Sequence, residues 1–209
     1  MVLKFLYHFL HLLFYIIGKL FFRYKTCGVE HVPKKGSAIL ASNHASYLDP
    51  AFVGMGIVRT INYLAKKELF SNIILRLILK DICKGIPVDR EQLDRDTLRE
   101  IYRLLKTDEI ILLFPEGTRS YDGNLMEPKL GIGMIAYNTR ATVVPVYVNG
   151  SYNIMSRKTQ FIRLKPCSVL YGPPLALESY YNQKKSKELY KTISLKIMEG
   201  IEGLKERCQ

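Results

Sequence analysis

The sequence predicts a single α/β domain built on a largely parallel, partly mixed β-sheet that is covered by helices. Its 209 residues fit one domain, and no internal repeat, low-complexity tract or linker divides them. Short apolar runs alternate with longer segments of helical periodicity, which is typical of parallel strands buried on both faces. The hydrophobic share of 48% and the charged share of 24% exclude a disordered chain.

Individual elements follow from these runs. Strands are expected at residues 37–41, 61–65, 86–88, 110–114, 143–148 and 168–171. Helices are expected at residues 49–58, 91–105, 131–138 and 184–205, and an apolar segment at residues 69–79. Asp49 followed by Pro50 is typical of a helix N-cap and first helical residue. In the second of these helices, Leu93, Thr97 and Ile101 share one side.

The N-terminal segment, residues 3–22, is predicted to be a membrane-associated helix. Its polar positions recur at helical spacing and form one stripe: Lys4, His8, His11, Tyr15 and Lys19. The helix would be about 30 Å long, which is just enough to span a bilayer. A span would bury the stripe in hydrocarbon, so an in-plane helix with its stripe toward water fits better.

Three alternatives for this segment stay open. It could be a single span, a cleaved signal peptide, although no small-residue cleavage site follows, or a buried core helix. With the in-plane interpretation, the chain divides into a membrane-associated helix at residues 1–25 and one α/β domain at residues 26–209. The expected location is the cytoplasmic face of the cell membrane.

The charge of the chain indicates an anionic partner. Thirty-one Lys and Arg against 19 Asp and Glu give a net charge of +12, which suits membrane phospholipid, nucleic acid or an acidic carrier protein. No RNA-recognition or helix-turn-helix signature accompanies the charge, so no nucleic acid is expected. The cysteines at 27, 83, 167 and 208 form no C-x-x-C pair, which favours free thiols in a reducing cytoplasm over zinc. No metal or cofactor is expected.

The segment at residues 43–50 reads NHASYLDP and follows the first expected strand. His44 and Asp49 cannot share a helical face, because five residues rotate a helix by about 500°. If the loop bends back, Asp49 would fix the imidazole tautomer and His44 would accept a hydroxyl proton. The alternative is that Asp49 only caps a helix and His44 is an ordinary loop residue.

A second motif, FPEGTRS at residues 114–120, directly follows the buried run at 110–114. Arg119 could bind a phosphate through its planar fork, and Glu116 could hold Arg119 or an acceptor hydroxyl. Arg90, which follows the third expected strand, and Lys66, at the end of the second, could add positive charge. Ligands bind outside the carboxyl ends of strands in α/β sheets, so these loops are expected to meet at one site. An ordinary turn and surface cations are the alternative interpretation.

Four blocks together make the chain resemble the 1-acylglycerol-3-phosphate acyltransferase family. They are NHASYLDP (43–50), GIPVDR (85–90), FPEGTRS (114–120) and VVPV (143–146), and the match covers about residues 26 to 175. The resemblance implies an enzyme that transfers a fatty acyl group from acyl-CoA or acyl carrier protein to the 2-hydroxyl of lysophosphatidic acid, giving phosphatidic acid. It also implies an integral or monotopic membrane enzyme, and the net charge of +12 makes an anionic membrane surface an expected partner.

The resemblance implies a role for each site residue. His44 is the base and Asp49 its partner, and no acyl-enzyme forms. Arg90, Glu116 and Arg119 are expected to bind the acceptor. Gly117 and Thr118 of the same turn, and Lys66, are expected to contribute to substrate binding. Separately from the resemblance, a backbone N–H in the turn at residues 116–118 is a candidate oxyanion donor. The segment before His44 is short, which leaves one helix and residues 69–79 as membrane contacts.

Two alternative functions remain. One is a glycerol-3-phosphate or other lysophospholipid acyltransferase, since the sequence does not reveal the contacts to the acceptor head group. The other is a non-catalytic basic protein that binds anionic membranes, for which His44 and Asp49 would be dispensable.

Overall fold

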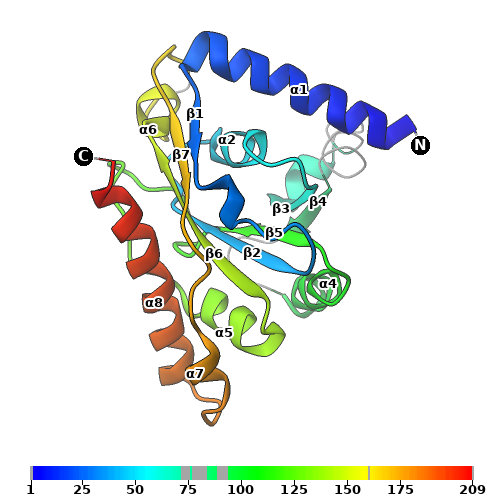
Figure 1. The fold of residues 1–209 in the computed structure, drawn as a ribbon, viewed down its shortest axis with the longest axis vertical. Helices are drawn as coiled ribbons and strands as arrows, with labels where there is room; N and C mark the ends of the chain where they lie inside the picture. Colours follow the sequence, from blue (N-terminus) through cyan, green and yellow to red (C-terminus); the bar gives the residue numbers. More distant parts are fainter. Residues whose placement is uncertain (1, 72–75, 77–83, 89–93, 160, 209) are drawn as a thin grey trace.

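The computed structural model describes residues 2–208 except 72–75, 77–83, 89–93 and 160 (Figure 1). Within these ranges the strands are β1 (Lys25–Cys27), β2 (Ala38–Ser42), β3 (Ile61–Lys66), β4 (Gly85–Val88), β5 (Ile110–Leu113), β6 (Thr142–Asn149) and β7 (Ser168–Tyr171). They form one sheet in the order β1-β7-β6-β2-β5-β3-β4. All neighbouring pairs are parallel except β6 and β7. The predicted largely parallel, partly mixed sheet is therefore confirmed.

The described helices are α1 (Val2–Phe22), α2 (Asp49–Met55), α4 (Arg95–Leu105), α5 (Leu130–Thr139), α6 (Ser151–Ile154), α7 (Glu178–Tyr181) and α8 (Lys187–Glu206), with short 3-10 turns η1 (Val29–His31) and η2 (Lys67–Phe70). Helix α4 begins later than predicted, because the Asp94 side chain accepts the Thr97 N–H at 2.7 Å and caps it. The apolar segment 69–79 lies largely outside the described residues. The three-residue strand β1 was not predicted.

Both faces of the sheet are buried, which explains its near-continuous apolar strands. Successive residues of a strand point to opposite faces, so Leu40 and Ile39 of β2 belong to different cores. One core packs against α1 and α2, and the other against α4, α5 and α8 (Figure 1). The sheet is thus a rigid, covered layer, and its carboxyl edge remains available for loops.

Helix α1 is present as predicted, but its polar stripe does not all face water. His11 Nε2 lies 3.2 Å from the carbonyl oxygen of Gly54 in α2, and Gly18 packs closely against Met55. Tyr15 packs edge-to-face against Tyr24. The residues of the stripe therefore have two environments. His11 and Tyr15 contact polar and aromatic groups of the domain, whereas His8 and Lys19 are exposed.

The opposite side of α1 is apolar and exposed. We call it the outer face; it consists of Phe9, Leu12, Leu13, Ile16 and Leu20. These positions recur at helical spacing and turn away from α2. Among the described residues, no helix is both long and apolar enough to cross a bilayer. The predicted division at residue 25 stays a prediction, and Lys25 is the first residue of β1.

Candidate active site

His44, in the loop that follows β2, and Asp49, the first residue of α2, form a buried hydrogen-bonded pair. His44 Nδ1 lies 2.9 Å from Asp49 Oδ2. The loop bends back as expected, because the same oxygen also accepts the backbone N–H groups of Ala45 and Ser46, each at 2.7 Å. Asp49 does not cap α2: it lies inside the helix, and Leu48 occupies the cap position. The helix-cap interpretation of Asp49 is therefore wrong.

The pairing selects one form of the histidine. A carboxylate only accepts hydrogen bonds, so Nδ1 of His44 carries the proton and the lone pair of the neutral ring lies on Nε2. The ring stacks on Phe114, with 3.8 Å between the ring centroids and 14° between the planes. This arrangement fixes the orientation of the imidazole and would stabilise an imidazolium at this position, which is the geometry that a general base requires.

Neighbouring strands hold this loop in place. The side-chain amide of Asn43 donates to the Val148 carbonyl at 3.1 Å and accepts the Val148 N–H at 2.7 Å, which extends the pairing of β2 with β6. The backbone N–H of Ser120 donates to the His44 carbonyl at 2.7 Å. The two sequence motifs are therefore in direct contact at the carboxyl edge of the sheet, as expected.

Glu116 is a buried carboxyl group beside the histidine loop. Its residue is only 3% exposed, and no described residue forms a hydrogen bond with either carboxylate oxygen. Burial raises the pKa of Glu116 to about 8, and the nearby Asp49 carboxylate adds to the rise. The backbone N–H groups of His44 and Met126 face the carboxylate without well-formed hydrogen bonds to it, and they partly oppose the rise. Buried polar groups without partners are uncommon in proteins, so this carboxyl is a candidate ligand-binding group.

Arg119 is also buried, and its guanidinium is packed for binding an anion. The guanidinium carbon lies 3.3 Å from the centroid of the Tyr47 ring. Among the described residues, none forms a hydrogen bond with Nε or Nη1 of Arg119, and none of their ion pairs joins it to Glu116. Glu116 therefore does not hold Arg119 in an ion pair, and the fork keeps donors for a ligand.

Gly117 shapes the turn between these two residues. Its φ of +68° is left-handed, and a Cβ there would lie 2.7 Å from Cδ and 3.1 Å from Nζ of Lys129. Lys129 thus lies over the turn and brings an ammonium group near Arg119's loop. Thr118 is half-buried in the same turn. The Gly117 N–H donates to the Phe114 carbonyl at 3.0 Å, so it is used within the turn and is not an oxyanion donor. The turn still brings the Lys129 ammonium group close to the loop of Arg119, which suits a phosphate.

Two predicted binding residues are not placed by these observations. Arg90 lies outside the described residues. Lys66 ends β3, with its backbone in register with Val88, and its side chain lies outside the described atoms. Their assignment as acceptor-binding residues therefore stays a prediction.

Four site residues were not predicted from the sequence: Asn43, Tyr47, Phe114 and Lys129. Tyr47 lies in the same motif as His44, and Phe114 lies in the same motif as Arg119. Membership of these motifs is the sequence signal that could have identified both residues. No local pattern marks Lys129, because its approach to Gly117 depends on how the chain returns before α5. In the part of the chain that is described, no three His, Cys, Asp or Glu side chains cluster as metal ligands.

These features define the class of the protein: an α/β enzyme with a buried histidine–aspartate pair beside a turn that carries Glu116 and Arg119. Comparison with known proteins gives the family. The family model described as Acyltransferase matches residues 23–149, and the chain belongs to this family.

Named relatives agree with the family. The chain is 32% identical over 152 residues to the 1-acyl-sn-glycerol-3-phosphate acyltransferase of Bacillus subtilis, covering 72% of this chain and 73% of that one. It is 31% identical over 160 residues to the enzyme of that name from Limnanthes douglasii, covering 75% of this chain and 56% of the plant protein, so it spans little more than half of that relative.

A solved structure is also similar. The crystal structure of the 1-acyl-sn-glycerophosphate (LPA) acyltransferase PlsC from Thermotoga maritima has a TM-score of 0.75 and 26% sequence identity to this chain. The match covers 95% of this chain and 81% of that chain, which confirms the predicted α/β fold.

Proposed function

We propose that the protein transfers a fatty acyl group to the 2-hydroxyl of 1-acylglycerol 3-phosphate, giving phosphatidic acid for phospholipid biosynthesis. One observation carries the proposal: the buried His44–Asp49 pair lies in direct backbone contact with the turn that holds Glu116 and Arg119. Relatives that carry this activity in their names support the choice of acceptor. The donor is a thioester, either acyl-CoA or acyl carrier protein.

The transfer needs no acyl-enzyme. His44 Nε2 accepts the proton of the acceptor hydroxyl while the hydroxyl oxygen attacks the thioester carbonyl carbon. Asp49 stabilises the imidazolium that results. When the tetrahedral intermediate collapses, the C–S bond breaks and the imidazolium returns its proton to the leaving thiolate, so the base is regenerated.

The phosphate of the acceptor positions its hydroxyl for this attack. Arg119 is the primary ligand, because its buried fork keeps Nε and Nη1 available while Tyr47 supports its plane. Lys129 over the Gly117 turn supplies a second cation. We assign Arg90 and Lys66 to the same phosphate as further cations. Holding the acceptor at a fixed distance from the base contributes much of the rate in such reactions.

The test is a direct assay of the purified full-length protein in detergent. It compares lysophosphatidic acid, glycerol 3-phosphate and a zwitterionic lysophospholipid as acceptors, each with acyl-CoA and with acyl carrier protein. Formation of phosphatidic acid from lysophosphatidic acid at the highest kcat/KM supports the proposal. A higher value for another acceptor would reassign the substrate, and no transfer to any acceptor would favour a non-catalytic membrane-binding protein.

We also propose that α1 lies in the plane of an anionic membrane surface, with its outer face among the lipid chains. The outer face is exposed and apolar, while the inner side of the helix packs against α2, so the domain would lie on the water side. The proposed location is the cytoplasmic face of the cell membrane, because the described cysteines are free thiols and suit a reducing compartment.

Because each buried Leu or Ile contributes roughly 1.5–3 kcal/mol, hydrophobic insertion should outweigh charge attraction. The wild-type protein should therefore float with membranes at high salt. Leu12→Gln combined with Ile16→Gln should make this binding salt-sensitive, and Leu195→Gln on α8 is the matched control. Deleting α1 is less suitable, because Phe22 and Gly18 pack against the domain. Release of the wild-type protein by salt alone would contradict the proposed insertion.

A further inference from the structure

A short segment between α6 and β7 presents apolar and basic side chains to solvent. In residues 161–165, Phe161 is 84% exposed, Ile162 54% and Leu164 62%. Arg163 and Lys165 alternate with them and are exposed as well. The segment is not a loose tail, because the Arg163 N–H donates to the Ile154 carbonyl at 2.9 Å. Adjacent exposed apolar residues of this kind mark a contact surface, unlike single exposed residues.

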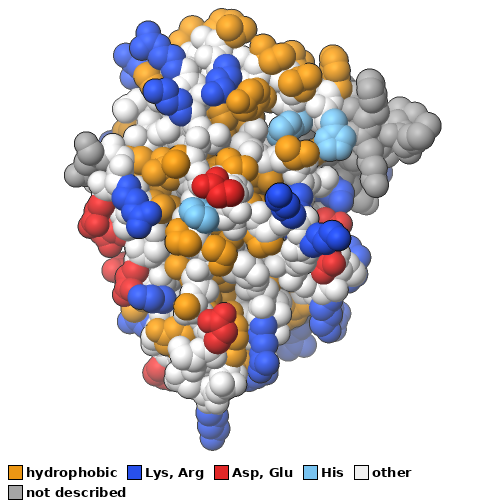
Figure 2. Space-filling model, viewed as in Figure 1, with side chains coloured by type: hydrophobic (Ala, Val, Ile, Leu, Met, Phe, Trp, Pro, Cys, Tyr) orange, Lys and Arg blue, Asp and Glu red, His pale blue; other side chains and the backbone are white. Residues whose placement is uncertain are grey.

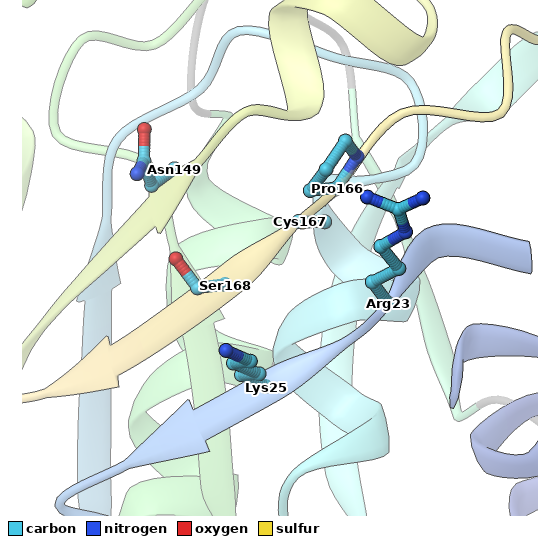
Figure 3. A pocket seen from close by; sticks show the side chains of 6 residues that line it. All are labelled: Arg23, Lys25, Asn149, Pro166, Cys167 and Ser168. Atoms are coloured by element: carbon cyan, nitrogen blue, oxygen red, sulfur yellow. The ribbon is translucent and has the colours of Figure 1, made fainter. Parts of the chain in front are cut away.

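The segment ends beside the carboxyl end of α1. The N–H of Cys167 donates to the Phe22 carbonyl at 2.9 Å, and the N–H of Lys25 donates to the Cys167 carbonyl at 3.2 Å. A cavity of ≈ 360 Å³ lies at this junction, and its lining consists of Arg23, Lys25, Asn149, Pro166, Cys167 and Ser168 (Figure 3). In Figure 2, Lys and Arg side chains gather next to the apolar band along α1. The exposed segment, the cavity and the end of α1 therefore lie together at this junction.

The same junction lies on the edge of the sheet that carries the active site. Asn149 ends β6 directly after Val148, whose backbone is bonded to Asn43 next to His44. The chain after α6 also reaches the phosphate-binding turn, because Arg157 donates from Nη1 to the Arg119 carbonyl at 3.3 Å. A membrane that touches residues 161–165 is thus on the side of the domain where a lipid acceptor must enter.

We propose that residues 161–165, together with Arg23 and Lys25, form a second membrane contact whose occupant is an anionic phospholipid bilayer. The apolar side chains of the segment insert to the depth of the lipid head groups. The basic side chains of Arg23, Lys25, Arg163 and Lys165 bind lipid phosphates at and beside the cavity. Charge complementarity selects this occupant, since Arg163 and Lys165 alternate with the apolar side chains and Arg23 and Lys25 line the adjacent cavity. With α1 as the first contact, the second one sets the angle at which the active-site edge meets the bilayer. The proposal rests on the proposed membrane function of α1 and adds a separate surface to it.

The chain contains no tryptophan, so the fluorescence of a single introduced tryptophan reports the environment of that one position. Phe161→Trp in the full-length protein should shift its fluorescence emission to shorter wavelength with vesicles of phosphatidylcholine and phosphatidylglycerol in a 7:3 ratio. Brominated lipid chains should quench it. Leu195→Trp, on the exposed side of α8, is the matched control and should change little. Equal responses at both positions, or no response at Phe161→Trp, would overturn the proposal.

A double substitution of two basic residues tests the electrostatic part of the proposal. Each basic residue near an anionic surface contributes about fivefold to binding, so Arg163→Gln with Lys165→Gln should weaken vesicle binding on the order of 25-fold. The effect should disappear on pure phosphatidylcholine vesicles. Lys187→Gln with Lys191→Gln on α8 is the control and should leave binding nearly unchanged. Acyl transfer to detergent-solubilised acceptor should be unaffected by either pair.

The outcomes separate this inference from the proposed function. If the protein transfers no acyl group but Phe161→Trp still enters vesicles, the enzyme assignment fails and the membrane contact stands. If acyl transfer is normal and Phe161→Trp stays in water, the second contact is wrong. An emission shift that appears without lipid and grows with protein concentration would identify a second copy of the chain as the occupant and would likewise overturn the proposal.

Discussion

Glu116→Gln should stabilise the protein at alkaline pH. Burial raises the pKa of Glu116 from 4.5 to about 8, so the folded protein binds this proton more tightly than the unfolded chain. The free energy of unfolding that depends on Glu116 is therefore fully present below about pH 4.5 and is lost as the pH rises through about 8. One pKa unit corresponds to about 1.4 kcal/mol, so ionisation costs on the order of 5 kcal/mol.

Glutamine has nearly the same shape but does not ionise, so the variant avoids this loss. For a domain of about 200 residues, 1 kcal/mol changes Tm by about 2–4 °C. Relative to the wild type, Glu116→Gln should therefore gain on the order of 10 °C between pH 5 and pH 9. Thermal unfolding followed by circular dichroism in detergent measures the difference, and other titrating groups cancel between the two proteins.

Glu127→Gln is the control, because Glu127 is an exposed carboxylate close to the same turn. Its Tm change at pH 9 should be much smaller than that of Glu116→Gln. If the difference between Glu116→Gln and the wild type is the same at pH 5 and pH 9, the carboxyl of Glu116 is not held in its neutral form by burial. The proposed character of the site would then be incorrect.

Three further predictions concern the active site. Asp49→Asn should lower kcat by about 10⁴-fold, because the amide can hold His44 in the wrong tautomer; a kcat within tenfold of wild type would contradict the pairing. Arg119→Lys should raise the acceptor KM more than the donor KM, since the planar fork is lost, and an effect on the donor alone would reassign the residue. Gly117→Ala should lower Tm about as much as Gly36→Ala, because both have positive φ and the Cβ at Gly117 would meet only the flexible end of Lys129; it should in addition raise the acceptor KM by displacing that ammonium group, so an unchanged acceptor KM would contradict the place of Lys129 over the turn.

The position of the site could be predicted because parallel strands place their carboxyl ends at one edge. Residues that follow β2 and β5 in the sequence must therefore lie close together, and Ser120 and His44 are in backbone contact. The His44–Asp49 contact could be predicted only as one of two possibilities. Which one holds depends on the direction of the Asp49 side chain, and the N–H groups of Ala45 and Ser46 determine that direction.

The orientation of α1 could not be predicted from its pattern. A polar stripe on a helix indicates that one side differs from the other, but not whether the polar side meets water or protein. His11 meets a backbone carbonyl of α2, so its polarity is satisfied inside the molecule. The support of Arg119 by Tyr47 and the approach of Lys129 to Gly117 likewise depend on tertiary packing, which local sequence does not encode.

The most direct measurement is the rate at which purified full-length His44→Ala forms phosphatidic acid from lysophosphatidic acid and an acyl thioester. Loss of the general base should reduce kcat by roughly 10²–10⁴-fold, while Tm remains near that of the wild type. His8→Ala, which changes an exposed histidine on α1, should keep full activity in detergent. A folded His44→Ala protein with activity within tenfold of wild type would show that His44 is not the base of this reaction.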